Sequence, residues 1–288
     1  MRGKKKEKYQ IILSLSQEFT LAVLFKISKT NRASYYKWLN GKPEDLTVEE
    51  LIIRHFTKYR KRQGVIKLKQ SLFFEHKLVV NHKKIRRVLR SKGLVCPIRR
   101  KKFKKEPAFD QTYQDNILNR DFKPDKPNIR LATDFTYLTV QGTTYFLSVV
   151  LDLFDNYPLI WYITDSCDKT LSLNTIDLLS EKMDLKGCLF HSDRGVQYTC
   201  RTFVERLKEE GVIQSMSRSG NCWDNAVMEN FFGILKTETI YLEPARARTL
   251  DSLTELLAEG FDYYINHRPI TALGGVPPAE YRRNYCPA

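Results

Sequence analysis

The spacing of apolar side chains divides the chain into a helical front and a mixed back. In residues 7–40 apolar positions recur at helical spacing with a polar break at 28–31, which predicts two short helices. Such a pair is a candidate helix-turn-helix, although helix pairs with a short turn also serve only to pack a core. Another helix is expected from Thr47, which has the spacing of a capping box with Glu50, and a further one at 67–74.

The helix expected after Asn81 is the most informative element of the front, because Asn is a favoured N-cap residue and two distinct faces follow it. Its apolar stripe comprises Ile85, Val88 and Leu89, and its basic face comprises Lys83, Arg86, Arg87 and Arg90. A helix with one buried face and one cationic face is suited to a DNA major groove. The alternative is a surface helix whose charges are only solvated.

Beyond about residue 129 the apolar positions alternate as they do in strands. Strands are expected at 130–140, 145–153, 159–164, 187–191 and 212–217, and helices at 169–183, at 201–210 and from Trp223 onward. The first three strands have short connections and predict an antiparallel meander. The whole segment is then an α/β domain with a mixed five-stranded sheet and flanking helices. Residues 106–128 contain three prolines and little periodicity, which indicates a linker.

The distribution of charge adds a partner to this layout. The net charge is +15, but residues 1–105 hold 30 Lys and Arg against 7 Asp and Glu, a net of +23, whereas the remainder holds 18 against 26, a net of −8. A basic module joined to an acidic one indicates that the front meets phosphates and that the back needs cations to do so.

Composition also excludes several classes of protein. No stretch approaches 18 consecutive apolar residues, and the basic N-terminus does not lead into the apolar region of a signal peptide, so a soluble cytoplasmic protein is expected. The six cysteines are scattered without a CxxC pair, which favours reduced, packed thiols. His76 and His82 have only Cys96 nearby, one ligand short of a closed zinc site.

Three carboxylates stand out against the predicted elements. Asp134 lies within the first strand, Asp193 lies just past the carboxyl end of the fourth, and Glu229 follows after 35 intervening residues on a helix. Open sheets form ligand crevices at such strand ends. Hard oxygen ligands in this number suit Mg²⁺ or Mn²⁺, and two such ions can hold the attacking and leaving oxygens of a phosphodiester.

The helix that carries Glu229 is expected to bury one stripe and to turn the acid the other way. The predicted buried stripe comprises Trp223, Val227, Phe231 and Ile234, and the opposite face comprises Asn225, Glu229, Gly233 and Lys236. On that face Glu229 could reach a metal, Lys236 could pair with a DNA phosphate, and Asn225 could support the acids or contact DNA, a helix-capping or surface role being its alternative. His191, two residues before Asp193, could orient that acid or the substrate, or be a structural histidine.

The same residues resemble a known family. The stretches 132–137, 191–198 and 217–232 are similar to the integrase core of bacterial insertion-sequence transposases, namely the protein of the second reading frame, a core shared with retroviral integrases. Residues 264–269 and 277–282 resemble that family's C-terminal signature, and residues 80–89 resemble its upstream helix-turn-helix. The resemblance therefore runs from about residue 47 to residue 283.

The resemblance implies a ribonuclease-H-like fold in which Asp134, Asp193 and Glu229 are the catalytic, metal-binding acids and Lys236 is the basic residue two turns after the Glu. It implies a transposase that cleaves the ends of its element and joins them to target DNA, with two Mg²⁺ or Mn²⁺ ions per site. Two positions depart from the family pattern: Leu131 stands near the place of a Trp, and Asn156 with Tyr157 stands where a basic pair is common.

Two other functions are left open by the sequence. One is a nuclease of the same fold that degrades RNA in hybrids, and the other is a DNA-binding regulatory product that is inactive without fusion to the first reading frame. The expected partners are double-stranded DNA, at terminal inverted repeats and at the target, a second copy of the chain and the first-frame protein, with no membrane. A bacterial transposase would work at the nucleoid.

The expected domains follow from these boundaries. They are an N-terminal helical region at 1–43, a basic helix-turn-helix-like DNA-binding domain at 44–105, a linker at 106–128, an integrase-like catalytic core at 129–240 and a C-terminal helical extension at 241–288.

Overall fold

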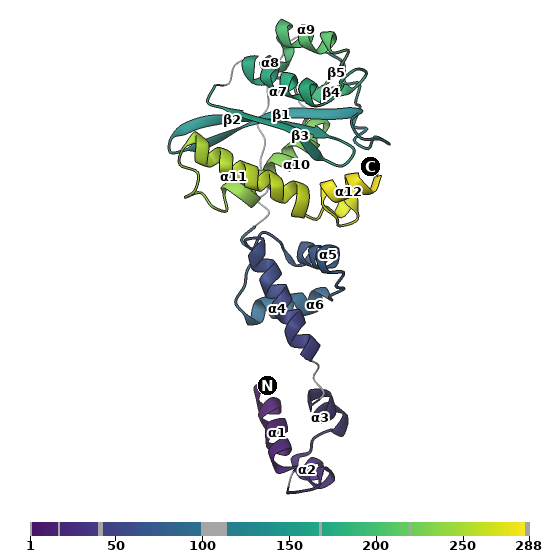
Figure 1. Cartoon of the computed structure of the whole chain (residues 1–288), viewed down its shortest axis with the longest axis vertical. Coiled ribbons are helices and arrows are strands. Elements are labelled where there is room, and N and C mark those ends of the chain that lie inside the picture. Colours follow the sequence, from purple (N-terminus) through teal and green to yellow (C-terminus); the bar gives the residue numbers. More distant parts are fainter. Residues whose placement is uncertain are drawn as a thin grey trace. The chain divides into compact units, whose positions relative to one another are not determined.

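A computed structural model of the chain describes residues 2–16, 18–39, 43–98, 114–166, 169–218 and 221–285 (Figure 1). The chain divides into two compact units, Met1–Thr57 and Lys58–Ala288, and each is considered by itself. Within the described residues no helix combines the length and the apolar content needed to cross a bilayer.

The first unit is entirely helical. It contains α1 (Arg2–Leu15), α2 (Leu21–Ser28) and α3 (Arg32–Leu39), which confirms the helix pair predicted within residues 7–40 and adds a helix before it. Its small core is built on Ile12, Leu24 and Tyr35. Because Tyr35 is almost completely buried, at 1% exposure, its aromatic ring serves packing.

Helix α4 (Pro43–Lys58) begins four residues before the predicted capping box. Thr47 therefore lies inside the helix and the prediction that it caps the N-terminus was wrong. Proline is well accommodated in the first turn of a helix, because its missing N–H has no partner there in any case, so Pro43 provides an earlier start.

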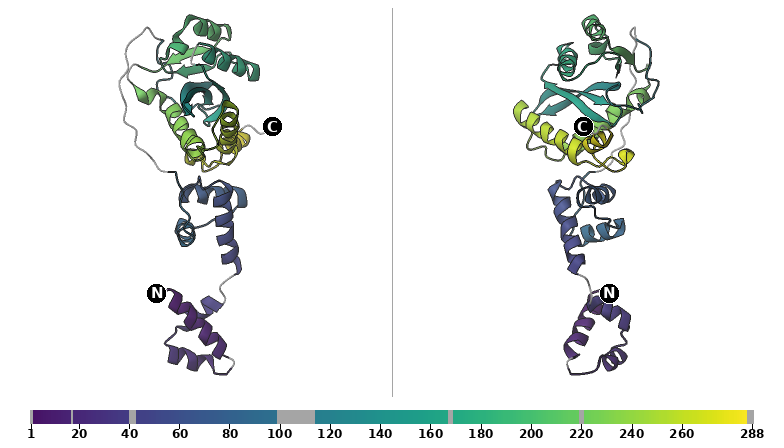
Figure 2. Two further views of the ribbon diagram at one scale, coloured as in Figure 1. Left: turned by 90° about the vertical axis from the view of Figure 1, so that its left-hand side faces the viewer. Right: turned by 45° about the vertical axis from the view of Figure 1, so that its right-hand side comes forward.

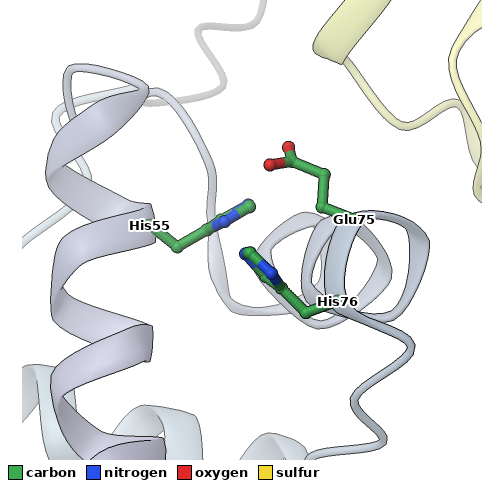
Figure 3. Close-up of side chains that lie close together, drawn as sticks. All are labelled: His55, Glu75 and His76. Atoms are coloured by element: carbon green, nitrogen blue, oxygen red, sulfur yellow. The ribbon is translucent and has the colours of Figure 1, made fainter.

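The second unit opens with two helices, α5 (Val65–His76) and α6 (His82–Ser91), which confirm the helices predicted at 67–74 and after Asn81. The cap is also confirmed, since Oδ1 of Asn81 accepts a hydrogen bond of 2.8 Å from the backbone N–H of Lys83. At the end of α5, Glu75 and His76 project side by side from the last turn (Figure 3). Glu75 accepts hydrogen bonds from Lys58 Nζ and from the hydroxyl of Tyr59.

A five-stranded mixed sheet forms the centre of the second unit, as predicted (Figures 1 and 2). Its strands, in the spatial order β3-β2-β1-β4-β5, are β1 (Arg130–Val140), β2 (Thr143–Asp152), β3 (Tyr157–Thr164), β4 (Leu189–Ser192) and β5 (Ile213–Met216). The first three strands form the antiparallel meander, whereas β4 and β5 run parallel to β1.

Helices cover both faces of the sheet (Figure 1). One core lies under α7 (Lys169–Lys182), α8 (Val196–Thr199) and α9 (Arg201–Glu209), and the other under α10 (Ala226–Leu235) and α11 (Leu250–Asp262). Around these lie the short helices Cys222–Asn225, Lys236–Ile240, Tyr263–His267 and Thr271–Leu273, and α12 (Pro278–Tyr285). The apolar stripe of α11 is buried in the second core, so these side chains pack within the chain.

The predicted linker differs from what the structure shows. Residues 106–113 lie outside the described residues, but 114–128 pack against the sheet. Leu118 is buried in the core under α10, and its backbone N–H donates a hydrogen bond of 3.0 Å to Oγ of Ser215 in β5. Leu118 and Phe122 provide the apolar contacts between this segment and the core.

Candidate active site

The sheet register brings the first two acids together. Ala132 of β1 is the partner of His191 in the parallel strand β4, so Asp134 and Asp193, each two residues further on, reach the same end of the sheet. Asp134 still lies inside β1, opposite Val149 of β2, and Asp193 follows directly after β4. Both acids therefore lie at the strand ends, where open sheets bind ligands.

Each of these acids is fixed by the backbone beside it. Oδ1 of Asp134 accepts a hydrogen bond of 2.8 Å from the N–H of Phe135, and Oδ1 of Asp193 accepts one of 2.9 Å from the N–H of Gly195. Burial raises the pKa of Asp134 well above its ordinary value, and the negative charges of Asp193 and Glu229 raise it further. Burial likewise raises the pKa of Asp193.

Glu229 lies on the exposed face of α10, as predicted, while Met228 and Phe231 point into the core. Its charge acts on Asp134, which places it on the same side of the sheet edge. Among the described residues, the three acids are not a group whose ligand atoms all lie within 4.8 Å of one another.

The chemistry of these side chains fits divalent cations. Burial and the negative charges of Asp193 and Glu229 favour the protonated form of Asp134, an effect that a bound cation would offset, and hard oxygen donors are the ligands of Mg²⁺ and Mn²⁺. The residues that could hold such ions are Asp134, Asp193 and Glu229.

Asn225 links the start of α10, the helix of Glu229, to β1, the strand of Asp134. Its amide Nδ2 donates a hydrogen bond of 2.9 Å to Oδ2 of Asp134, and its side chain is 7% exposed. It precedes α10 directly but makes no side-chain hydrogen bond to cap that helix. The geometry therefore favours support of the acid over the alternative role of a helix cap.

Lys236, at the end of α10, also faces the acid centre. Its Nζ lies 5.0 Å from the centre of the Tyr137 ring. Burial lowers the pKa of Lys236, and the negative charge of Asp134 opposes that shift. A half-buried ammonium therefore lies near Asp134, and its contact with a DNA phosphate stays a prediction.

His191 has a structural environment. Its two ring nitrogens lie 2.9 Å from Oγ of Ser215 and 3.1 Å from Oγ of Ser217, on the neighbouring strand and just beyond it. Burial lowers the pKa of His191 to about 4. Because both nitrogens are engaged by serine hydroxyls, the ring holds β4 to β5, and the alternative that it orients Asp193 finds no contact here.

A charged cluster under the loop before α10 was not predicted. The buried carboxylate of Asp224 accepts hydrogen bonds from Arg218, through its Nε, Nη2 and backbone N–H, from Nε of Arg120 and from Nδ2 of Asn116. The hydrogen bonds of Arg218 hold the pKa of Asp224 well below its ordinary value, although burial opposes this shift. Arg218 and Asp224 lie close enough in sequence to suggest an ion pair. Arg120, by contrast, lies in the segment predicted to be a linker.

The four cations predicted on α6 are exposed, and Ile85, Val88 and Leu89 on the opposite face are buried. The division of this helix into an apolar and a basic face is therefore confirmed. The basic face comprises Lys83, Arg86, Arg87 and Arg90. Contact of this face with DNA stays a prediction.

Comparison with known proteins agrees with these features. Models described as integrase core domains match residues 124–222 and 210–278, and a model described as an HTH-like domain matches residues 43–102. A putative transposase for the insertion sequence element IS150 of Escherichia coli is 33% identical, over 96% of this chain and 99% of that protein. A transposase for the insertion sequence IS3A of the same organism is 27% identical, over 95% and 98%.

Solved structures share the fold at low sequence identity. An intasome of simian T-cell lymphotropic virus contains a chain that matches with a TM-score of 0.50 at 15% identity, over 76% of this chain and 69% of that one. With the mixed sheet, the acids at its strand ends and the basic helical front, the full-length match to the IS150 protein shows the family: this chain belongs to the insertion-sequence transposases that carry an HTH-like domain and an integrase core.

Proposed function

We propose that the chain is a DNA transposase that cleaves the ends of its insertion sequence and transfers them to target DNA by one-step phosphoryl transfer. The observation that carries this proposal is the position of Asp134. It is partly buried, the negative charges of Asp193 and Glu229 raise its pKa, and its carboxylate accepts a hydrogen bond from the amide of Asn225. A chain that only bound DNA would have no use for such mutually repelling carboxylates.

In the proposed mechanism, Asp134, Asp193 and Glu229 would hold two Mg²⁺ or Mn²⁺ ions. When bound, the two ions would activate the attacking oxygen and stabilise the leaving 3′ oxygen. Lys236 binds a phosphate of the strand to be cut, and Asn225 keeps the Asp134 carboxylate oriented. Water is the nucleophile in cleavage, and the freed 3′-OH is the nucleophile in strand transfer.

No protein side chain serves as nucleophile in this scheme. Tyr198 is buried beside the acids, and burial, with the charges of Asp134 and Asp193, raises its pKa well above the ordinary value. The hydroxyl of Ser192 donates a hydrogen bond to the carbonyl of Asp193. A covalent protein–DNA intermediate is therefore not expected.

The proposed partners are the terminal inverted repeats and the target duplex. The basic face of α6 holds the repeat, and two chains join the two ends, since strand transfer acts on both. We infer a cytoplasmic protein working on the nucleoid, which could also act as a fusion with the first-frame protein.

The test uses the purified full-length chain, Mg²⁺ and a duplex that carries the element's terminal repeat. End cleavage or strand joining is expected, and it should be lost in Asp134→Asn, Asp193→Asn and Glu229→Gln while DNA binding is kept. Binding without cleavage by the unmodified chain, with activity restored by fusion to the first-frame protein, would point to the regulatory function instead. Preference for an RNA–DNA hybrid over the duplex would point to the nuclease.

A further inference from the structure

Trp223 is exposed at the entrance to the helix that carries Glu229. The sequence predicted it in the buried stripe of that helix, which was wrong: Trp223 is 68% exposed and lies in a 3₁₀ helix, Cys222–Asn225, before α10 begins. Trp161, by contrast, is covered by the ring of Phe261, stacked at a centroid distance of 4.9 Å. Trp and Tyr are the side chains most often used to anchor a binding partner.

The residues that follow Trp223 are held in place by the core of the site. Asp224 is 1% exposed and bound by two arginines, and Asn225 donates its hydrogen bond to Asp134. The indole is thus presented from a short helix whose other side is anchored at the acid centre. An aromatic surface fixed in this way loses little conformational entropy when a partner stacks on it.

Two further apolar side chains are exposed close in sequence to the other two acids. Tyr137, at 64% exposure, follows Asp134 by three residues, and Val196, at 67%, follows Asp193 by three. We name Tyr137, Val196 and Trp223 the apolar collar of the site.

Cations accompany two members of the apolar collar. Lys236 lies over the ring of Tyr137, and the side chains of Arg120 and Arg218, bound to the residue after Trp223, are 44% and 45% exposed. Two arginines on one aspartate leave a net positive charge. Apolar faces beside cations are the chemistry that receives nucleobases and backbone phosphates.

We propose that Trp223 stacks on a base that is unpaired at the end of the element, next to the phosphodiester held by the acids. This inference rests on the proposed function and adds to it a positioning residue. Asp134 lies inside β1 and is partly buried, so a strand that has separated from its complement can bring its phosphate closer to this acid than an intact duplex can. Separation costs free energy, and stacking on an aromatic ring offsets it by about 5- to 150-fold in equilibrium constant per base.

The first experiment compares two substrates in single-turnover cleavage by the full-length chain. One duplex carries the fully paired terminal repeat, and the other has mismatches that unpair its last three base pairs. We expect Trp223→Ala to slow cleavage of the paired end about 10- to 100-fold, Trp223→Phe to slow it less, and the mismatched end to restore Trp223→Ala to within a few-fold of the unmodified chain. Tyr241→Ala, which removes another exposed aromatic ring, is the matched control and should cleave both normally.

Two outcomes would overturn the inference: normal cleavage of the paired end by Trp223→Ala, or an equal loss on both duplexes, which would indicate a role in folding or in a contact with a second copy. A second measurement does not depend on cleavage. In a chain with Trp38→Phe, Trp161→Phe and Asp193→Asn, Trp223 is the sole source of tryptophan fluorescence. Stacking predicts quenching by the mismatched end and much weaker quenching by a blunt paired end. If the unmodified chain cut neither duplex, the proposed function would fail, and the fluorescence would still decide whether Trp223 binds a base.

Discussion

Nδ2 of Asn225 donates a hydrogen bond of 2.9 Å to Oδ2 of Asp134, joining the start of α10 to the middle of β1 across 91 positions of sequence. Since the other oxygen of Asp134 accepts the N–H of Phe135, both oxygens have a donor. Oδ1 of Asn225 is buried and accepts no hydrogen bond from the described residues. The side-chain amide of Asn225 therefore fixes the orientation of the Asp134 carboxylate, and its Oδ1 remains beside that carboxylate as a hydrogen-bond acceptor.

Replacing Asn225 should impair the reaction more than the fold. Supporting residues around metal ligands typically contribute 10- to 100-fold to metal affinity or activity. We expect Asn225→Ala to lower the cleavage rate by about that factor at low Mg²⁺ and to recover partly at high Mg²⁺, because the loosened carboxylate still binds. Asn225→Asp should be worse, since it adds a fourth negative charge. The measurement is the Mg²⁺ dependence of single-turnover cleavage, and an unchanged dependence in both variants would contradict the role.

The sequence revealed the acids because strand ends obey simple rules. The alternation of apolar residues located β1 and β4. In these parallel strands Ala132 pairs with His191, so the residues two positions further on, Asp134 and Asp193, reach the same edge of the sheet. The prediction that Trp223 is buried assumed α-helical periodicity, 100° per residue, for residues before α10. These residues form a 3₁₀ helix, which has three residues per turn, so Trp223 faces another direction. Where the α-helix begins depends on the contacts of Asp224 and Asn225 with distant residues, and these cannot be read from local periodicity.

The segment before the sheet shows the same limit. Its prolines and irregular spacing predicted a linker, yet Arg120 reaches the buried Asp224 and Leu118 enters the core. Two apolar residues among polar ones do not form a periodic pattern, so only the tertiary fold reveals that they are covered. The helices before the sheet were easier to predict from sequence, because α6 shows both its apolar and its basic face within ten residues.

The Asp224 cluster should stabilise the fold over a defined range of pH. In Asp224→Asn, Arg120 and Arg218 lose their anion, and because both are partly exposed we expect a loss of about 1–2 kcal/mol in the free energy of unfolding. The folded pKa of Asp224 is lowered, so its contribution is complete above the ordinary pKa of about 4 and declines as the pH falls below it toward the folded pKa.

Urea unfolding of the two proteins between pH 7 and pH 3 measures this contribution. The difference should be constant down to about pH 5 and should shrink below pH 4. Asp125→Asn, at an exposed position of the same segment, is the control and should show no difference. A difference that grows toward acid pH would rule out the ion pairs as its origin.

Glu238 connects α5 to the residue that follows the helix Tyr263–His267. Its buried carboxylate accepts two hydrogen bonds from Arg268, at 2.9 and 3.1 Å, and one of 2.7 Å from Nζ of Lys67. Burial raises the pKa of Glu238, but the charges of Arg268 and Lys67 outweigh that effect and lower it. Glu238 lies in the helical turn Lys236–Ile240, two residues after the lysine at the active site.

Glu238→Gln should therefore be costly. It leaves the guanidinium of Arg268, which is 8% exposed, without its counter-charge, and removing one partner of a buried pair costs about 3–5 kcal/mol. We expect this variant to have a lower unfolding midpoint. Its amide exchange should accelerate more in α5 than in β1 and β2. The exposed Glu255→Gln is the control, and equal stability of the two variants would show that Lys67 and Arg268 find other partners.

The basic face of α6 should contribute to affinity through phosphates. Each cation that neutralises a phosphate releases about one counterion, so Arg86→Ala and Arg90→Ala should each reduce the slope of log K against log salt concentration by about 1. Cleavage at saturating protein should be unaffected. Lys208→Ala, an equally exposed cation on α9, should leave the slope unchanged, and a loss of affinity of the same size in that variant would argue against a dedicated surface.

Asp134→Asn should exchange activity for stability. The folded pKa of Asp134 is raised by burial and by the two neighbouring acids, so the ionised carboxylate costs free energy at neutral pH, and this cost vanishes once the pH is below the ordinary value. A neutral amide of the same shape removes the repulsion, and without metal the variant should unfold at a higher temperature than the unmodified chain at pH 7 but not at pH 3.5.

Adding Mg²⁺ should reverse the order of the two unfolding temperatures, because a ligand at 100 times its dissociation constant stabilises the fold by about 2.7 kcal/mol and the variant lacks the Asp134 carboxylate. Thermal unfolding with and without Mg²⁺ at the two pH values measures both effects. An unmodified chain that gains nothing from Mg²⁺, or a variant that gains equally, would show that Asp134 does not hold the ions.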